Sequence, residues 1–422
     1  MTQPPHSTRT LADWLLWMEQ CHPSEIELGL SRVSQVAERL AVDLSASRVV
    51  TIAGTNGKGS TVRYLQTIYQ LAGYRVGCYT SPHFLHYNER IELKGQPVSD
   101  AQLCAAFASI NQARGDIALT YFEFGTLAAL LIFSQEKPDL VLLEVGLGGR
   151  LDAVNIVDPD VAVVTTIALD HQDWLGDTRE AIGFEKAGIF RSGKPAVCGD
   201  PDLPNSVVAT AHKLNAPLYR TGYEYGWTDT SDYCQFNGQD VGGRSWVLSD
   251  IPRPMLPEAN AATALQVTAL LDLPLSNTVR RQGIAEARLT GRMQKLEYRG
   301  INFWLDVAHN PEAAELLAQR LSDKGGTAVI VLAMLKDKDR AAVVAALAPQ
   351  VQTWHLADLQ VPRGGTAAEL AALLPSTAEV NLHGSVTDAI GELLQGEILP
   401  QNVIIAGSFY TVAEALSVLD RE

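Results

Sequence analysis

The sequence is poor in cysteine and in positive charge, and each shortage excludes a class of protein. Only five cysteines occur among 422 residues, and an odd, scattered set forms neither a disulfide framework nor a metal-ligand motif. We expect them to be reduced and to serve as small apolar side chains; they are Cys21, Cys78, Cys104, Cys198 and Cys234. The net charge is -15, which argues against a nucleic-acid-binding surface and against a polybasic membrane anchor.

Long hydrophobic runs are missing as well. No apolar stretch approaches the roughly 20 residues of a membrane-spanning helix. The first ten residues, MTQPPHSTRT, lack the basic region and apolar stretch of a signal peptide. We therefore expect a cytoplasmic protein. The length of 422 residues predicts two or three domains. Hydrophobic residues make up 46% of the chain and charged residues 19%, which is enough to build their cores.

Apolar strand-like runs alternate with helical patterns over most of the length. This alternation predicts an α/β fold with a parallel sheet covered on both faces. Between residues 200 and 255 the sequence becomes rich in aromatics, Gly, Asp and Ser, which predicts an irregular or antiparallel segment. A second strand–helix cycle begins near residue 296. We therefore predict a first domain over residues 1–295 and a smaller Rossmann-like domain over residues 296–422.

The stretch TIAGTNGKGSTVRYL, residues 51–65, combines a buried strand, a glycine-dense turn and a helix. Glycines let the backbone approach a ligand closely, and the helix N-terminus suits a phosphate. Lys58 supplies a point charge, and Ser60 or Thr61 supplies a hydroxyl for magnesium. The pattern predicts a polyphosphate cradle. Its spacing is shorter than that of the common phosphate loop, and Gly59 separates Lys58 from the hydroxyl residue, so an ordinary strand-to-helix turn is the alternative.

Polar residues follow three other predicted strands. Ser81, Glu144 and His171 each come directly at or after a strand end. The carboxyl ends of neighbouring parallel strands converge where such sheets bind ligands. A hydroxyl, a carboxylate and an imidazole near phosphates could hold magnesium, although histidine is an unusual ligand for so hard a cation. The alternatives are a capped strand end for Glu144 and a hydrogen-bonded loop histidine for His171.

These motifs resemble the folylpolyglutamate synthase family, within the Mur ligase superfamily. The resemblance covers nearly the whole chain and rests on GTNGKGS, TSPH, LTYFE, LEVGLGGRLDAVN, ALDHQDWLG, EKAGIF, PEANAATAL, LTGRMQ, DVAHNP and GSFYTV. The two-domain length and LTYFEFGT are most similar to the bacterial members that combine dihydrofolate synthase and folylpolyglutamate synthase activities. The resemblance implies a P-loop-type ATPase domain with a parallel sheet, followed by a smaller Rossmann-like domain that closes over the ATP and glutamate cleft. It further implies a ligase that uses ATP to add L-glutamate to dihydropteroate and reduced folates through an acyl phosphate. Separately, we expect the protein to be a monomer.

The same resemblance implies roles for individual residues. The ATP-binding positions are Thr55, Asn56, Gly57, Lys58, Gly59, Ser60, Asn260, Arg292 and Asp306. Two magnesium ions would be held by Ser81, Glu144 and His171. Lys186 corresponds to a lysine carried as a carbamate, whereas its sequence context alone predicts a surface helix lysine. The catalytic candidates are Lys58, His171, Lys186, Arg292 and His309. For Arg292, an interdomain salt bridge is the alternative to a transition-state cation.

Three segments correspond to the family's pterin site. They comprise Glu27, Leu28, Gly29 and Leu30, then Thr120, Tyr121, Phe122 and Glu123, and then Leu151, Asp152 and Ala153. Phe122 could stack on a flat ring, although YFEF by itself is typical of a core. The chain departs from the family at Thr290, where proline is frequent, and at Glu27, where aspartate is frequent.

Two other functions share parts of this pattern. A Mur-type ligase of cell-wall synthesis should carry a domain for a uridine nucleotide before the glycine turn, but here that turn already begins at Gly54. A nucleotide-gated binding protein would not need Asp306, His309 and Arg292, which lie on both sides of the predicted domain boundary and suit chemistry across a cleft. A small-molecule kinase is a third alternative, since it would release a phosphorylated substrate.

Overall fold

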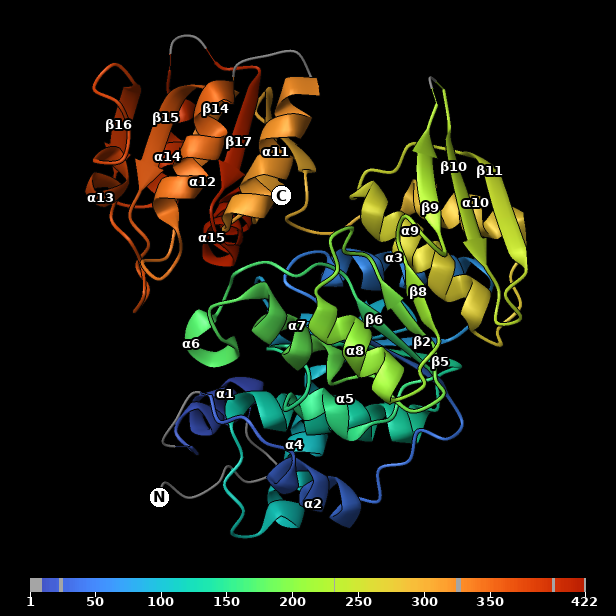
Figure 1. Ribbon diagram of the computed structural model, residues 1–422. Helices are drawn as coiled ribbons and strands as arrows, with labels where there is room; N and C mark the ends of the chain where they lie inside the picture. Colours follow the sequence, from blue (N-terminus) through green and yellow to red (C-terminus); the bar gives the residue numbers. More distant parts are fainter. Residues whose placement is uncertain (1–9, 23–25, 231, 324–327, 397–398, 421–422) are drawn as a thin grey trace. The chain divides into compact units, whose positions relative to one another are not determined.

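The computed structural model describes residues 10–22, 26–230, 232–323, 328–396 and 399–420 (Figure 1). Residues 1–9 lie outside this range. They include most of the segment MTQPPHSTRT, which was predicted not to be a signal peptide. The chain divides into two compact units, Met1–Ala287 and Arg288–Glu422. The sequence had placed the division between residues 295 and 296, and we describe each unit by itself.

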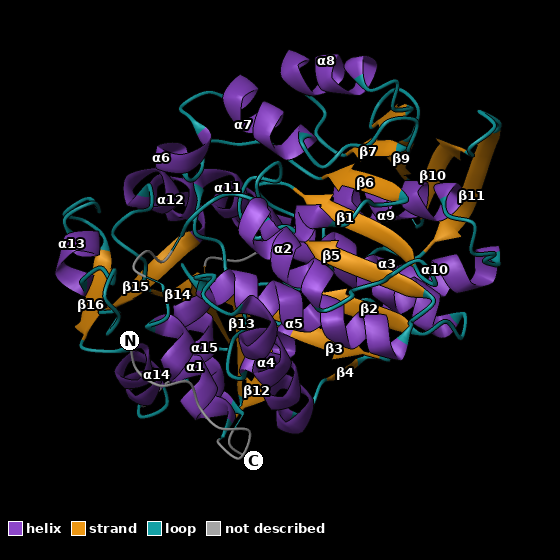
Figure 2. Cartoon of the chain, turned by 90° about the horizontal axis from the view of Figure 1, so that it is seen from below, coloured by secondary structure: helices purple, strands orange, loops and turns teal. Residues whose placement is uncertain are grey.

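The N-terminal unit is built on an eight-stranded sheet with the order β4-β3-β2-β5-β1-β6-β7-β8. Figure 2 shows β7, β6, β1, β5, β2, β3 and β4 side by side. In this order, the neighbouring strands β2, β5, β1, β6, β7 and β8 are parallel. Strands β3 and β4 form an antiparallel edge next to β2. Their bounds are β1 Arg48–Ala53, β2 Val76–Tyr79, β3 Ile91–Leu93, β4 Gln96–Pro97, β5 Leu140–Glu144, β6 Val161–Val164, β7 Ala196–Cys198 and β8 Leu218–Arg220. The central strands are buried along nearly their whole length, as expected for a sheet covered on both faces.

Helices cover both faces of this sheet. Among the parallel strands, the chain moves across the sheet in one direction from β1 to β2, and from β2 onward it moves in the opposite direction. Because crossovers between parallel strands are right-handed, α3 lies on one face, and α5, α7 and α8 lie on the other. Helices α9 and α10 pack on α3, and α1, α2 and α4 pack around α5. Their bounds are α1 Leu11–Glu19, α2 Ser31–Arg39, α3 Lys58–Leu71, α4 Asp100–Arg114, α5 Tyr121–Glu136, α6 Gln172–Leu175, α7 Arg179–Ala187, α8 Asn205–Lys213, α9 Glu258–Leu270 and α10 Asn277–Glu286.

The segment predicted to be irregular or antiparallel contains α8, β8 and a separate small sheet. This sheet has the order β11-β10-β9 and is antiparallel throughout. It is formed by β9 Gly226–Asp229, β10 Cys234–Gln239 and β11 Ser245–Ile251. Alternate residues of β10 are buried, because one face of the sheet packs against α9 and α10.

The C-terminal unit is a six-stranded sheet with the order β12-β13-β17-β14-β15-β16. Only β12 runs antiparallel, in a hairpin with β13, and the other strands are parallel. The strands are β12 Gln294–Tyr298, β13 Ile301–Asp306, β14 Ala328–Leu332, β15 Val351–Ala357, β16 Glu379–His383 and β17 Asn402–Ala406. The helices are α11 Pro311–Asp323, α12 Arg340–Leu347, α13 Ala367–Ala371, α14 Val386–Leu393 and α15 Phe409–Leu419.

Parallel sheets flanked by helices in both units confirm the predicted α/β class. Within the described residues, no helix combines the length and the apolar composition that crossing a bilayer requires.

Candidate active site

The turn between β1 and α3 contains two positions at which a side chain would not fit. Gly54 has φ +152°, and a Cβ there would lie 1.8 Å from the hydroxyl oxygen of Thr165. Gly57 has φ +87°, and a Cβ there would lie 2.4 Å from the side-chain oxygen of Asn260. The turn is therefore packed between the loop after β6 and the first turn of α9, and the Asn260 side chain borders it.

Hydrogen bonds hold Thr55 and Asn56 to the loop after β6. The Thr55 N–H donates to the Thr166 carbonyl at 2.8 Å, and the Asn56 N–H donates to the Thr166 hydroxyl at 3.1 Å. The Thr55 hydroxyl accepts from the Ala168 N–H at 3.0 Å. The backbone amides of Thr55 and Asn56 thus anchor the turn. The first bond of α3 runs from Thr61 N–H to the Gly57 carbonyl, so the N-terminal end of the helix, with Gly59 and Ser60, is the part suited to an anion.

Lys58 places its charge over this turn. Its Nζ donates to the Gly54 carbonyl at 2.9 Å and to the Thr55 carbonyl at 3.2 Å. The ammonium group is therefore held beside the helix N-terminus, where both the charge and the helix dipole favour a phosphate.

Lys186 on α7 is buried, so the interpretation as a surface lysine, based on its sequence context alone, was wrong. The residue is 4% exposed because the face of α7 that carries it also carries Ile182, Gly183 and Ala187, all buried. Burial and the nearby charge of Lys58 lower the pKa of Lys186 to about 7, and the charge of Asp170 opposes this decrease. An amine with this pKa is largely neutral at slightly alkaline pH, and its nitrogen is then nucleophilic.

The candidate magnesium ligands lie at the carboxyl edge of the same sheet. Glu144 ends β5 and is 6% exposed, and one of its oxygens accepts from the Ser81 N–H at 3.3 Å. The structure thus brings these two residues together. His171 follows β6 in a left-handed conformation, with φ +51°, and its side chain is 45% exposed. Carboxylate and hydroxyl oxygens suit magnesium, whereas an imidazole is more typical of softer metals.

The three predicted pterin segments meet in the N-terminal unit. Gly29 N–H donates to the Leu151 carbonyl at 3.3 Å, which joins the first segment to the third. The ring of Phe122 lies against Gly146, because a Cβ on that glycine would come within 2.5 Å of it. Thr120 caps α5 in a reciprocal box with Glu123. The substrate candidates therefore form one cluster.

Asp152 is a buried carboxylate in this cluster. Its two oxygens accept from the Leu147 N–H at 2.9 Å and the Val154 N–H at 3.1 Å. Burial raises its pKa to about 6, and these hydrogen bonds and the charge of Lys58 oppose the increase. The carboxylate therefore fixes the glycine-rich loop and remains mostly ionised above neutral pH.

Arg32 on α2 connects the first and second segments, and sequence reasoning missed it. Its guanidinium donates to the Glu123 carboxylate at 3.1 Å and to the Glu27 carbonyl at 2.9 Å, and it also pairs with the Glu27 carboxylate. Glu27 further contacts His22 at 2.8 Å. The capping signal Thr120-x-x-Glu123 was visible in the sequence, but the long-range partner of Glu123 was not.

The C-terminal unit gathers its own predicted residues after β13. The Asp306 carboxylate accepts from the Met293 and Ala308 N–H groups, each at 3.0 Å. Burial raises the pKa of Asp306, and the charge of Arg292 opposes this. Arg292 and His309 both lie beside the ring of Phe409, at 6.0 and 6.4 Å from its centroid. Phe409 belongs to the GSFYTV motif, but no role had been assigned to it.

Comparisons with known proteins match this organisation. A model of the Mur ligase middle domain matches residues 52–224, and a model of the Mur ligase glutamate ligase domain matches residues 291–409. The chain is similar to the dihydrofolate synthase/folylpolyglutamate synthase of Escherichia coli strain K12, with 46% identity over 418 residues, 99% of this chain and 97% of that protein.

Solved structures are similar over the full length. One is the E. coli FolC protein in complex with DHPP and ADP, with a TM-score of 0.91, 46% identity and 99% of both chains covered. Another is a bifunctional folylpolyglutamate synthase/dihydrofolate synthase with Mn, AMPPNP and L-glutamate bound. Its TM-score is 0.90 at 48% identity, with 99% of this chain and 100% of that chain covered.

We predict that Arg32→Met lowers the free energy of unfolding of the N-terminal unit by roughly 1–3 kcal/mol, because it leaves the buried Glu123 carboxylate without its ion pair. Glu123 has a side chain only 4% exposed. In a Glu123→Gln background the same substitution should cost less, which denaturant titration of the four proteins measures.

Arg48→Met is the matched control, because Arg48 pairs with an Asp272 side chain that is 87% exposed, and such pairs contribute little. Equal losses for Arg32→Met in both backgrounds would contradict the proposed pairing.

Proposed function

This chain belongs to the dihydrofolate synthase/folylpolyglutamate synthase family of Mur ligases, and we propose that it joins L-glutamate to dihydropteroate and to reduced folates. It is an ATP-dependent carboxylate–amine ligase. The observation that carries this conclusion is full-length similarity to the E. coli enzyme, combined with a glycine turn that holds Lys58 beside the N-terminus of α3.

The reaction has two steps. A carboxylate oxygen of the acceptor attacks the γ-phosphorus of ATP, the bond to the β,γ-bridging oxygen breaks, and ADP leaves with that electron pair. The resulting acyl phosphate is attacked at its carbonyl carbon by the amine of glutamate. The amide bond forms, phosphate leaves, and the amine nitrogen loses a proton. Activation thus replaces a poor leaving group by phosphate.

The protein's main task in this reaction is to offset negative charge. Anionic oxygens of the acceptor and of ATP must approach one another, and fixed cations and amides make that approach favourable. Lys58 and the N-terminal amides of α3 carry this role for the phosphates. We assign Asn260 to nucleotide contact because it borders Gly57. Arg292, Asp306 and His309 of the C-terminal unit are assigned to the nucleotide and the transferring phosphate on the family resemblance.

Magnesium fits the oxygen donors at the sheet edge. Glu144 and Ser81 supply hard ligands, and His171 is the third candidate. When bound, the ion neutralises charge on the phosphate oxygens. Glu144 is the last residue of β5, and Ser81 and His171 lie in the segments that follow β2 and β6 of the same sheet.

Lys186 is assigned as a carbamate. Its neutral amine nitrogen attacks the carbon of CO₂, a C–N bond forms, and one proton is released, which leaves an anion at a buried position. Beside Lys58 a neutral or cationic amine gains nothing, whereas an anion is stabilised. A carbamate there can orient magnesium ligands from the outer shell.

The acceptor is recognised by the cluster around α5. Phe122 offers a ring face for the pterin, and Asp152 and the carbonyls of the 27–30 segment offer acceptors for its N–H groups. Arg32 keeps the first two segments in place.

We also propose a monomeric, cytoplasmic enzyme. All five cysteines are free thiols, which is typical of a reducing compartment. The net charge of -15 is unfavourable for nucleic acid.

The function is tested by product analysis. The protein is incubated with ATP, magnesium, L-glutamate and either dihydropteroate or tetrahydrofolate, and phosphate release and product mass are measured. We expect one glutamyl residue to be gained on each acceptor, with one phosphate released per glutamate. ATP hydrolysis that ignores both substrates would indicate a nucleotide-gated protein, and a phosphorylated acceptor would indicate a kinase.

Lys58→Ala should reduce kcat by roughly 10²–10³-fold or more, because it removes the cation beside the phosphates. The melting temperature should change little, since the two hydrogen bonds described above join Lys58 to carbonyls of its own turn and not to a distant element. Lys213→Ala at the exposed end of α8 removes the same charge elsewhere and should keep full activity. A Lys58→Ala enzyme as active as this control would refute the assigned cradle.

Lys186→Ala should lower activity roughly 10- to 100-fold, and acetate or propionate should partly restore it by supplying the missing carboxylate. Wild-type protein in ¹³C-bicarbonate should show a carbamate carbon signal that the variant lacks. This signal should fade as the pH falls below about 7, because the amine, whose pKa is about 7, is then protonated and cannot attack CO₂. Absence of both the signal and the rescue would exclude the carbamate.

A further inference from the structure

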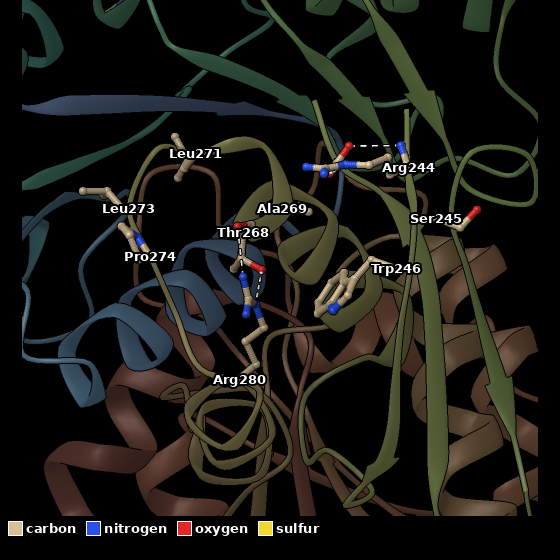
Figure 3. Close-up of a pocket in the computed structure, with 10 residues that line it drawn as sticks. Arg244, Ser245, Trp246, Thr268, Ala269, Leu271, Leu273, Pro274 and Arg280 are labelled. Atoms are coloured by element: carbon tan, nitrogen blue, oxygen red, sulfur yellow. Dashed lines mark hydrogen bonds and ion pairs between the residues drawn. The ribbon is translucent and has the colours of Figure 1, made fainter. Parts of the chain in front are cut away.

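A pocket of about 440 Å³ lies in the N-terminal unit between the end of α9, the segment before α10, and β11 (Figure 3). None of its lining residues belongs to the candidate active site. Its walls include Trp246 of β11, Thr268 of α9, Arg280 of α10, and the apolar side chains of Leu271, Leu273 and Pro274. The lining also includes Asp240, Arg244, Ser245 and Ala269, so apolar and polar groups share the walls. Pockets of this volume that combine apolar walls with fixed polar groups are typical of small-ligand sites.

Arg280 is the central polar group of this pocket. Its Nε donates to the Thr268 hydroxyl at 3.0 Å, and Nη1 donates to the Leu275 carbonyl at 2.7 Å. Two weaker contacts of 3.4 Å reach the Thr268 carbonyl and the Asn277 side chain. A guanidinium carries five N–H donors, so these four contacts leave one donor for a ligand.

All of these partners are neutral. In the described part of the chain, no carboxylate forms an ion pair with Arg280, and burial lowers the pKa of its guanidinium. A partly desolvated cation without a counter-ion is unfavourable. The other arginine at the pocket, Arg244, is already compensated, because its Nε pairs with the Asp240 carboxylate at 2.8 Å. Arg280 is therefore the charge that an incoming anion would neutralise.

Trp246 adds a flat apolar surface next to this charge. The Cζ atom of Arg280 lies 4.8 Å from the centroid of the indole ring, and Phe236 supports the ring from a centroid distance of 5.1 Å. Figure 3 shows the guanidinium held between Trp246 and Thr268. The hydrogen bonds to Thr268 and Leu275 fix its plane, so the group is preorganised rather than free to turn to solvent.

We propose that this pocket binds a small monoanion with a flat apolar ring, namely an aromatic carboxylate. The carboxylate pairs with Arg280, and the ring packs against Trp246 and the apolar wall of Leu271, Leu273 and Pro274. A neutral amide of the same shape lacks the charge that compensates Arg280, and an aromatic cation is repelled. This site does not depend on the ligase reaction proposed above.

The test uses 2-naphthoate and its neutral isostere 2-naphthamide as probes, titrated calorimetrically into the full chain. We expect saturable binding of 2-naphthoate and at least tenfold weaker binding of the amide. Arg280→Met should weaken 2-naphthoate at least tenfold and bring it to the level of the amide. Trp246→Leu should weaken both probes.

Arg281→Met is the matched control, because Arg281 neighbours Arg280 on the same helix but does not line the pocket, and its Nε donates to the Ser249 carbonyl at 2.6 Å. This variant should bind 2-naphthoate like the wild type. Binding of the probe at the pterin cluster would instead persist unchanged in Arg280→Met, so that variant separates the two sites.

Equal affinity of the wild type for both probes, or an unchanged affinity in a folded Arg280→Met protein, would overturn the proposal. Circular dichroism checks the fold of each variant. If Arg280→Met does not fold, the comparison of the two probes in the wild type and the Trp246→Leu result decide the question. Phosphate release with ATP, glutamate and dihydropteroate tests the ligase function separately, so failure of one proposal leaves the other intact.

Discussion

The close approach of two glycines to their neighbours fixes the turn on which the phosphate-binding part of the N-terminal unit depends. At Gly54 the backbone of the turn leaves no room for a Cβ beside Thr165, and at Gly57 it leaves none beside Asn260. The turn is thus confined between the loop after β6 and α9, and α3 begins immediately after it at Lys58. The strand-end residues of β2, β5 and β6 inherit their positions from the same parallel sheet.

This confinement also creates the main electrostatic problem of the site. Lys58 and Lys186 lie close enough for the charge of one to lower the pKa of the other, and Lys186 is nearly fully buried. A buried ammonium group near a second, partly exposed one is unfavourable, so the buried Lys186 is the group that favours losing its proton or becoming an anion. Asp170 offsets part of this repulsion. Conversion of Lys186 to an anion would turn the repulsion into attraction, which gives a physical reason for a carbamate at this position rather than a second cation.

The sequence predicted the regular elements well, because strongly periodic or continuous apolar runs are local signals. The strand, turn and helix predicted for residues 51–65 correspond to the end of β1, Arg48–Ala53, the glycine turn, and the start of α3, Lys58–Leu71. The α/β class and the ligase family were likewise accessible from motif order. Helix α5 was not predicted, because it is apolar on all sides and therefore lacks the helical period.

Properties that depend on distant residues were harder to predict. The burial of Lys186 depends on how α7 packs, and the link from Arg32 to Glu123 spans 91 residues of sequence. Among the described residues Arg280 has no carboxylate partner, and this too depends on how segments distant in the sequence pack together.

Helix α9 contributes residues both to the glycine turn and to the pocket around Arg280, at its two opposite ends. Its first turn carries Asn260 beside Gly57, and its last turns carry Thr268, which accepts from Arg280. The intervening residues are almost all buried, so the helix is held along its length by packing and at both ends by polar contacts. Because the helix is closely packed along its length, a small shift of a side chain at one end of α9 is not expected to move the side chains at its other end. The arginine pocket and the glycine turn are therefore best regarded as two separately organised surfaces of one scaffold, each defined by its own charge.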